Sequence, residues 1–378
     1  MASKSNIKIA FASVLKPIDD VRMYEKLALS AMKILPDATF HLIGFKTQNK
    51  INDATKNVFF YPIFRFKRLS FNRLLANFKL YSLLKKIKPT HLVICAVELL
   101  PSAVLFAKKN NVILIYDVQE NYVANILYTN TYPFLLRKII AYFIRKIEKW
   151  ADKTIQTYLL AEKIYFQEMP FVQKKSIFLE NKSIIEQEKG NQNNTNQYQN
   201  FIIAGTLAES YGLFVGIKWA EKMQKKINDF QLTIIGNCAK ISDFETLKNY
   251  SKKYKWIHLL ADTQPIPHQK IIETIQKNDI WLMPYIPEKH LLQRIPTKFY
   301  EGLALKKIMI IQKNSYWESF FQQFDFKSAI FIDFIDDENI NFHFDNFYND
   351  VNLPDLIFWK NEEKVWQNFL TLSVDKMK

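Results

Sequence analysis

The stretch FIIAGTLAESYG, residues 201–212, combines an apolar run, a glycine at its end and a second glycine where a helix should begin. This order is typical of one step of a doubly wound α/β sheet, in which a buried strand leads into a covering helix. Five further apolar runs, separated by helical patterns, are LTIIGN (232–237), WIHLL (256–260), DIWLMPY (279–285), IMIIQ (308–312) and AIFID (329–333). The second half is therefore predicted to form a parallel α/β unit.

The first half of the chain repeats this pattern. Its apolar runs are IKIAFASV (7–14), TFHLIGF (39–45), NVFFYPI (57–63), HLVICAV (91–97), VILIYDV (112–118), KTIQTYL (153–159) and KSIFLEN (175–181). Helical patterns lie between several of them, for example at 69–88 and 133–151. Near-continuous apolar runs alternating with helices predict a second parallel sheet that is covered on both faces.

A polar, Asn/Gln-rich stretch, EQEKGNQNNTNQYQ (186–199), separates the two halves and is predicted to be an interdomain linker. The predicted domains are therefore 1–185 and 200–345. A helical segment at 346–378, with Ile357, Trp366, Phe369 and Leu370 among its apolar positions, is expected to pack back across the cleft between the domains. Ligands of open α/β sheets bind beyond the carboxyl ends of the strands, so the site is expected there.

Composition restricts the class of protein. The 378 residues are 48% hydrophobic and 15% aromatic, which allows large cores and argues against a disordered chain. The two cysteines, Cys95 and Cys238, each end an apolar run and form neither a disulfide framework nor a metal-ligand spacing. No window of about 18 apolar residues predicts a spanning helix, and the apolar stretch at 7–14 is short for a signal peptide. The expected location is the cytosol or the inner face of the plasma membrane.

The net charge of +15 is unevenly distributed. Residues 1–190 contain 30 Lys and Arg against 15 Asp and Glu, whereas residues 191–378 contain 22 of each class. A basic half suits a nucleic acid, an anionic membrane or an anionic substrate. No nucleic-acid-binding module is recognisable, so that class of partner ranks last and we expect no nucleic acid.

The segment RIPTKFYEGLALKK, residues 294–307, is the most specific candidate site. Pro296 suits the first position of a helix, and Ile295 cannot cap the helix with a side-chain oxygen. The first amides of this helix would then bind a diphosphate, with Arg294 and Lys298 as neighbouring cations. Glu301, one turn after Lys298, could accept hydrogen bonds from sugar hydroxyls. The alternative is an ordinary amphipathic helix with a Lys/Glu surface pair.

Glycines add weaker signals at the same ends of the predicted strands. Gly205 and Gly236 end two strands, and a missing Cβ lets a ligand approach the backbone closely. Gly212 stands at a predicted helix start, where amide groups could meet a phosphate. Gly302, inside the predicted helix, needs either close packing or a close ligand to offset its low helix propensity. Glycines that only turn a strand into a helix are an equal alternative for Gly205 and Gly236.

The segment IPTKFYEGLALKKIMI resembles the PTKLFEYMAAGKPVI stretch of family-four (group 1) retaining glycosyltransferases, which have the GT-B fold. FIIAGTLAESYG resembles their VGTLSEERG, and PIPHQKIIETIQKNDIWLMPY resembles PYEELPELLAEADIGLVPY. FLEN before the linker is similar to VLPN, and YDVQEN (116–121) is similar to YDVHEY. These similarities cover most of the chain in the family's order.

The resemblance implies two Rossmann-like domains that face a central cleft. It implies a metal-independent hexosyltransferase or related enzyme, without a cofactor, that uses a nucleotide-diphosphate sugar as donor substrate and retains the anomeric configuration. The second domain would hold the donor and the first a glycan or lipid-linked acceptor, in cell-surface polysaccharide synthesis. Glu301 would hold the ribose, and Lys298 would lie by the diphosphate. The expected donor-binding residues are Gly205, Thr206, Gly236, Asn237, Pro284, Tyr285, Thr297 and Glu301. The expected catalytic residues are Gln119, Arg294 and Lys298.

Four positions depart from the family pattern. Gln293 stands where the family often has a glutamate, and Gln119 stands where a histidine is expected. The family's phosphate-binding Arg and Lys fall at Thr206 and Tyr211. One hypothesis is that Arg294 and Lys298 supply the missing charge. The alternative is a catalytically weakened GT-B-like scaffold that binds membrane or glycan.

Two stretches of the first half, 65–88 and 134–150, are both basic and aromatic. Cationic amphipathic helices with aromatic residues can lie on anionic lipid. The alternative is a pair of crossover helices with apolar faces on the sheet and lysines in water. The concentration of positive charge in this half favours a membrane surface as a partner.

Overall fold

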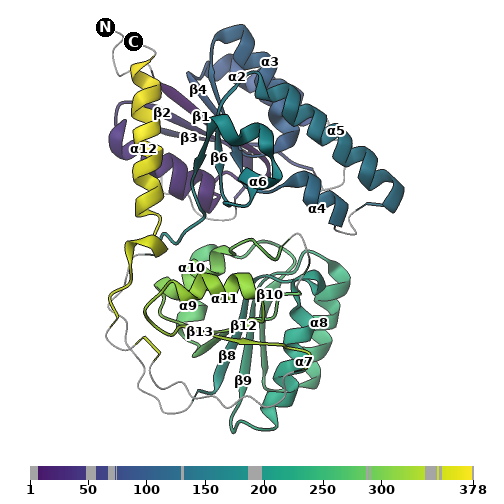
Figure 1. Cartoon of the computed structure of the whole chain (residues 1–378). Coiled ribbons are helices and arrows are strands. Elements are labelled where there is room, and N and C mark those ends of the chain that lie inside the picture. The colour runs from purple at the N-terminus through teal and green to yellow at the C-terminus, as the bar shows by residue number, and fades with distance from the viewer. Residues whose placement is uncertain are drawn as a thin grey trace. The chain divides into compact units, whose positions relative to one another are not determined.

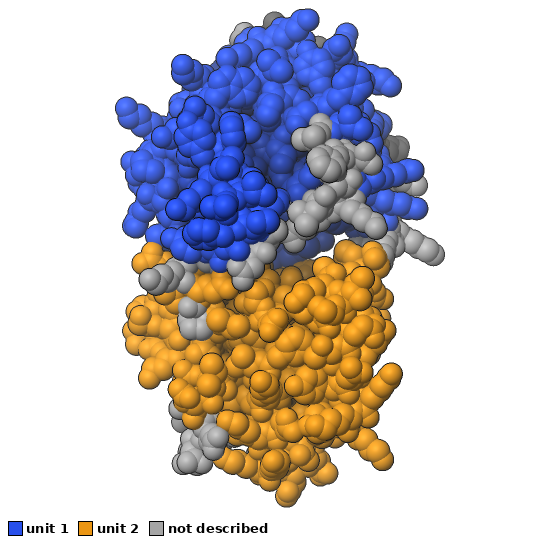
Figure 2. All heavy atoms as spheres, turned by 90° about the vertical axis from the view of Figure 1, so that its right-hand side faces the viewer, with its two compact units in different colours: residues 1–184, 359–378 blue, residues 185–358 orange. Residues whose placement is uncertain are grey.

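The computed structural model describes residues 7–47, 57–66, 73, 75–128, 132–185, 198–286, 288, 291–336, 347–348 and 351–376. The chain divides into two compact units, Met1–Ile184 with Trp359–Lys378 (unit 1) and Ile185–Phe358 (unit 2). Figure 2 colours these units separately. Most of the predicted linker, residues 186–197, lies outside the described residues.

Unit 1 contains a seven-stranded sheet in the order β3-β2-β1-β4-β5-β6-β7, and all neighbouring strands are parallel. Its strands are β1 (Lys8–Pro17), β2 (Thr39–Phe45), β3 (Val58–Phe64), β4 (His91–Ile94), β5 (Ile113–Val118), β6 (Ile155–Leu160) and β7 (Ser176–Phe178). Each of them lies within one of the seven predicted runs or overlaps it. The parallel α/β prediction for this half is confirmed.

Helices cover both faces of the unit 1 sheet (Figure 1). They are η2 (Val21–Ala28), α1 (Leu29–Ile34), α2 (Ala76–Ile87), η4 (Val97–Leu99), α3 (Leu100–Asn110), α4 (Tyr122–Tyr128), α5 (Phe134–Asp152), α6 (Tyr165–Glu168), η5 (Pro170–Lys175) and α12 (Lys360–Asp375). Alternate residues of β1 point into two cores. Ala10 and Ala12 pack in the core that α2 and α3 cover, whereas Ile9 and Phe11 pack in the core of η2, α1 and α12.

Unit 2 contains a six-stranded parallel sheet in the order β10-β9-β8-β11-β12-β13. Its strands are β8 (Asn200–Thr206), β9 (Gln231–Asn237), β10 (Ile257–Asp262), β11 (Ile280–Met283), β12 (Ile308–Gln312) and β13 (Ala329–Ile332). Its helices are η6 (Glu209–Tyr211), α7 (Leu213–Gln224), α8 (Ile241–Lys253), α9 (His268–Gln276), α10 (Thr297–Ala304), α11 (Ser315–Gln322) and η7 (Asp355–Ile357). The six predicted runs are its six strands. The order reverses between β8 and β11, and ligands of such sheets bind at that point.

The predicted C-terminal segment 346–378 is divided between the two units. Ile357 is fully buried in the core of unit 2, whereas α12 packs on η2 and α1 of unit 1. The indole N–H of Trp366 donates to the Leu27 carbonyl at 2.9 Å, and that of Trp359 donates to Ser30 Oγ at 2.9 Å. The end of the chain is therefore part of the first unit, and the boundary falls at Trp359 rather than at residue 346.

Candidate functional site

The candidate site of unit 2 lies at the carboxyl ends of β8 and β9. Gly205 has φ +99° and Gly236 has φ +147°, backbone conformations that residues with a side chain rarely adopt. A Cβ at Gly236 would lie 1.8 Å from the Gly205 carbonyl oxygen. At Gly236 the sequence predicted a close approach of a ligand to the backbone. In the structure, the group that comes close to Gly236 is the Gly205 backbone of the neighbouring strand β8. Asn237 beside it donates from Nδ2 to the Thr263 carbonyl at 2.8 Å.

The side chain of Lys298 fills the space beside Gly205. A Cβ at position 205 would lie 2.7 Å from Lys298 Cε and 3.1 Å from Lys298 Nζ. Lys298 Nζ also lies 5.6 Å from the centre of the Tyr285 ring. Three predicted site residues, from β8, α10 and the segment after β11, thus meet at one point. The φ of +99° favours glycine at position 205, and a Cβ there would also displace the end of the Lys298 side chain.

Lys298 is a half-buried cation that forms no ion pair within the described part of the chain. Burial lowers the pKa of its ammonium group to about 8, although Glu301 one turn away opposes this shift. A group whose charged form is penalised in this way gains from an incoming anion. The geometry can therefore bind an anion against the end of β8.

The start of α10 adds to this electrostatic pattern. The helix begins at Thr297, so Pro296 is the capping residue and not the first helical residue that its sequence predicted. The ψ of Pro296 is 138°, which places it in extended backbone just before the helix. Pro296 contributes no side-chain cap, and the positive end of the helix dipole lies at Thr297 and Lys298.

Glu301 on α10 bonds to His268, the first residue of α9. His268 Nε2 and Glu301 Oε1 are 2.9 Å apart, and the Glu301 side chain is 13% exposed. The histidine orients the carboxylate that the sequence assigned to sugar hydroxyls. His268 was not predicted, because its partner lies 33 residues away. A histidine before a predicted helix gave no local signal of that contact.

The two remaining glycines of the candidate site have packing roles. A Cβ at Gly302 would lie 2.3 Å from Met309 Sδ of β12, so close packing on the sheet explains this helix glycine. A Cβ at Gly212 would lie 1.5 Å from the carbonyl oxygen of the buried Pro284. Gly212 has φ +77° and precedes α7, as predicted. The alternative of a ligand beside Gly302 is not needed.

Arg294 lies in the turn before α10 and is half-buried. Its carbonyl accepts a hydrogen bond from Trp317 Nε1 at 2.8 Å, and its amide donates to the Leu291 carbonyl at 3.1 Å. These contacts fix the segment to α11. Thr206, in contrast, is exposed at the end of β8, and Gln293 is also exposed.

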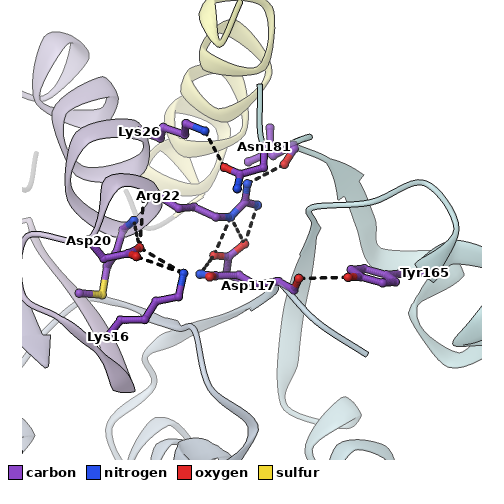
Figure 3. Close-up of polar contacts among 10 residues, drawn as sticks. Lys16, Asp20, Arg22, Lys26, Asp117, Tyr165 and Asn181 are labelled. Atoms are coloured by element: carbon purple, nitrogen blue, oxygen red, sulfur yellow. Dashed lines mark hydrogen bonds and ion pairs between the residues drawn. The ribbon is translucent and has the colours of Figure 1, made fainter. Parts of the chain in front are cut away.

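Unit 1 has a different group of charges at the ends of its strands (Figure 3). Arg22 Nη2 and Asp117 Oδ1 are 2.7 Å apart, and both residues are almost completely buried. Arg22 Nε contacts both Asp117 oxygens at 3.0 Å, and Nη1 donates to the Leu179 carbonyl at 2.8 Å. Gln119 Nε2 donates to Asp117 Oδ2 at 2.6 Å. Gln119 thus belongs to a network centred on Asp117.

Asp20 and Lys16 lie at the edge of this network. Asp20 caps η2 by accepting from the amides of Arg22 and Met23. Lys16 Nζ is 3.2 Å from Asp20 Oδ2, and its side chain is 34% exposed. Burial alone would lower the pKa of Lys16, but Asp20 and other acidic neighbours raise it. Lys16, Asp20 and Arg22 were not among the residues predicted from the sequence. The acid-rich turn directly after the first strand was the available signal.

Within the described ranges, no group of three or more His, Cys, Asp or Glu side chains is placed to hold a metal ion. No helix there is long and apolar enough to cross a membrane.

No protein-family model matches this sequence, and a search of curated proteins finds no match. Solved structures do match it. Sucrose-phosphate synthase from Thermosynechococcus elongatus aligns over 98% of both chains at 11% identity, with a TM-score of 0.62. The E. coli trehalose-6-phosphate protein bound with UDP-2-fluoro glucose covers 88% of this chain and 89% of its own at 11% identity, with a TM-score of 0.56. The chain has the GT-B fold.

A third GT-B structure is WaaG, a glycosyltransferase involved in lipopolysaccharide biosynthesis. It covers 97% of this chain and 90% of its own at 10% identity, with a TM-score of 0.57. In the GT-B chain described here, the second unit carries Gly205, Lys298, Tyr285 and Glu301 at adjoining positions. The fold expected from the sequence is thus confirmed. At 10–11% identity, the role of each residue has to be argued from its geometry in this chain.

Proposed function

We propose that this chain is a metal-independent glycosyltransferase that moves a sugar, with retention, from a nucleotide-diphosphate sugar to an acceptor. The acceptor class is a glycan or a lipid-linked glycan of cell-surface polysaccharide synthesis. The observation that carries the proposal is the Lys298 ammonium group against Gly205, in the first turn of α10. The GT-B fold and its glycosyltransferase neighbours support it.

Departure of a nucleoside diphosphate builds negative charge on its phosphate oxygens. Lys298 and the first amides of α10 are preorganised cations and dipoles, which stabilise such charge without reorganisation. Because position 205 has no side chain, the end of the Lys298 side chain lies against the end of β8, where Nζ is proposed to meet a phosphate oxygen. Arg294 is proposed as a second cation for this step, compensating for the uncharged Thr206 and Tyr211.

Glu301 is proposed to bind the ribose hydroxyls of the donor. An ionised carboxylate accepts hydrogen bonds only, and its second oxygen suits a hydroxyl while Oε1 bonds to His268. The UDP-2-fluoro glucose in the E. coli neighbour supports a nucleotide-sugar donor. The strand ends of unit 2 thereby supply both parts of a nucleotide site, an anion site and a hydroxyl acceptor.

Gln119 of unit 1 is proposed to orient the acceptor hydroxyl or the donor sugar. Its side chain is held by Asp117, and its carbonyl accepts from the Tyr165 hydroxyl at 3.1 Å. A residue whose side chain and backbone are both held by hydrogen bonds loses little entropy when it binds a substrate. Lys16, the partly exposed cation of the same network, is proposed to attract an anionic part of the acceptor.

A thermal-shift series with UDP, GDP and ADP, followed by a donor-hydrolysis screen over nucleotide sugars, tests the proposal. A nucleoside diphosphate at 100 times its Kd should stabilise the protein by about 2.7 kcal/mol. The Glu301→Ala variant should lose most of that stabilisation, and the screen should release one nucleoside diphosphate. Nucleotide binding without release in the presence of a range of glycan acceptors would indicate the weakened scaffold. The absence of any nucleotide effect would refute the proposal.

A further inference from the structure

Helix α5 has two apolar faces, although a helix at the surface of a soluble protein normally has one. Ala141, Glu148 and Ala151 are buried towards the rest of unit 1. The opposite face exposes Leu135 (78%) and Phe143 (59%). Other large apolar side chains exposed on this helix are Phe134, Leu136, Ile139, Tyr142 and Trp150.

The exposed positions 135, 139, 142, 143, 146 and 150 follow a helical spacing and form one stripe. Five of the six are Leu, Ile, Tyr, Phe and Trp, and the sixth is Lys146. We call these six residues, with Lys138 and Lys149 at their border, the α5 face. Isolated exposed apolar residues are common, but a contiguous stripe of them marks an interaction surface.

The charges of the α5 face are all positive. Lys138, Lys146 and Lys149 are exposed, and Lys146 Nζ lies 4.8 Å from the centre of the Tyr142 ring. The acidic residues of α5 are occupied elsewhere. Glu148 is buried and bonds to Arg145 at 2.9 Å, while Asp152 accepts from the Tyr158 hydroxyl at 2.9 Å. The stripe therefore combines apolar area with three exposed lysines, while the two acids of this helix contact other residues, Arg145 and Tyr158.

Helix α3 extends this surface beyond the end of α5. Lys108 Nζ lies 5.8 Å from the centre of the Trp150 ring, and Leu105 is 57% exposed. Helices α2 and α3 contain no acidic residue. Figure 1 shows α5 as a long helix at the border of unit 1, next to α4, with α2 and α3 on the same side of the sheet. The surface is thus extended, basic and apolar.

We propose that the α5 face binds the surface of an anionic phospholipid membrane. Leucine, isoleucine and phenylalanine can enter the acyl boundary, tyrosine and tryptophan prefer the headgroup level, and lysines contact the phosphates. A nucleic acid would meet the cations, but it offers no apolar medium for the aliphatic side chains. The excess positive charge of residues 1–190 complements anionic lipid over a wider area.

The second basic stretch, 65–88, contributes less to this surface. Its described helix, α2, buries Ala76, Leu80, Leu84 and Ile87 on the sheet, as the crossover-helix alternative requires. Phe78 is 76% exposed, whereas residues 67–72 and 74 lie outside the described residues. The proposal therefore rests on α5 and the adjoining end of α3.

Flotation of the full chain with vesicles tests this proposal. One set contains phosphatidylcholine alone and the other contains phosphatidylcholine with about one third phosphatidylglycerol. The wild type should float with the second set, and the bound fraction should fall as salt rises. Equal binding to both sets, or no binding to either, would overturn the proposal.

An apolar variant, Leu135→Gln, Ile139→Gln and Phe143→Gln, should weaken the partitioning by about tenfold or more. Its matched control replaces exposed apolar residues elsewhere with the same amide: Ile241→Gln, Val365→Gln and Leu372→Gln. The control should bind vesicles as the wild type does. Circular dichroism and thermal unfolding check that both proteins are folded.

A charge variant, Lys138→Glu, Lys146→Glu and Lys149→Glu, should also bind about tenfold or more weakly. Its control places the same substitutions on exposed lysines of unit 2: Lys225→Glu, Lys252→Glu and Lys277→Glu. The two proteins have equal net charge, so an equal loss in both would refute a role for the α5 face. Gel filtration provides a further check: a wild-type dimer that the apolar variant dissociates, without vesicle binding, would make this face a protein interface.

The membrane proposal does not rest on the proposed function. Vesicle binding requires no nucleotide, and the nucleotide experiments require no lipid. A negative result in the vesicle experiment would therefore not affect the nucleotide experiment, and the reverse is also true.

Discussion

The two units of this chain share an architecture but use charge at their strand ends in opposite ways. In unit 1, Arg22 is fully paired with Asp117 in the interior. In unit 2, Lys298 lies against Gly205 with a lowered pKa and no ion pair within the described part of the chain. A neutralised pair holds the backbone in place, whereas a desolvated cation is prepared for an anionic ligand.

Removing the charge of Asp117 and removing that of Lys298 should therefore have different effects on the free energy of unfolding. Asp117→Ala would leave the Arg22 guanidinium buried without its carboxylate, which should lower the free energy of unfolding by about 3–5 kcal/mol. Urea denaturation measures this loss. The control is Glu245→Ala, which removes the exposed pair with Lys248 and should cost less than about 1 kcal/mol. Similar small losses in both variants would remove the distinction between the units.

Lys298→Met should have the opposite profile. The free energy of unfolding should stay the same or rise, because the variant removes a charge that burial disfavours. The affinity for a nucleoside diphosphate should fall by about tenfold or more, since hydrogen bonds to charged groups contribute about 1.5–3 kcal/mol. Isothermal titration of both proteins measures the affinity. Unchanged binding would show that this lysine is a packing residue.

The pH dependence of nucleotide binding gives the smallest and most selective effect. The pKa of Lys298 in the free protein is about 8, so the fraction that carries the charge falls as pH rises through that value. Affinity should therefore decrease by about twofold between pH 7 and pH 8, and further above it. The Lys298→Met variant serves as the control, because ionisation of the nucleotide affects both proteins equally. Parallel profiles for the two proteins would contradict the assignment.

The positions of the strands could be read from the sequence, and several residues of the candidate site could be named from it. Each of the thirteen apolar runs overlaps a strand, because the strands of a parallel sheet that helices cover on both faces are mainly apolar. Gly205, Lys298 and Glu301 were singled out from their positions at a strand end or in the first turns of a helix, whereas Tyr285 was expected only from the family resemblance. Such positions are local properties of the chain, and local patterns express them directly.

Tertiary structure alone decided which distant residues meet. His268 joins Glu301, Arg22 joins Asp117 across 95 residues, and Met309 explains Gly302. Tertiary structure also distinguishes the two basic stretches that the sequence treated alike. Helix α2 packs its apolar residues against the sheet, whereas α5 leaves a stripe of apolar residues exposed. The physical reason is that periodicity fixes which side chains share a face of a helix. Only packing decides whether that face is covered.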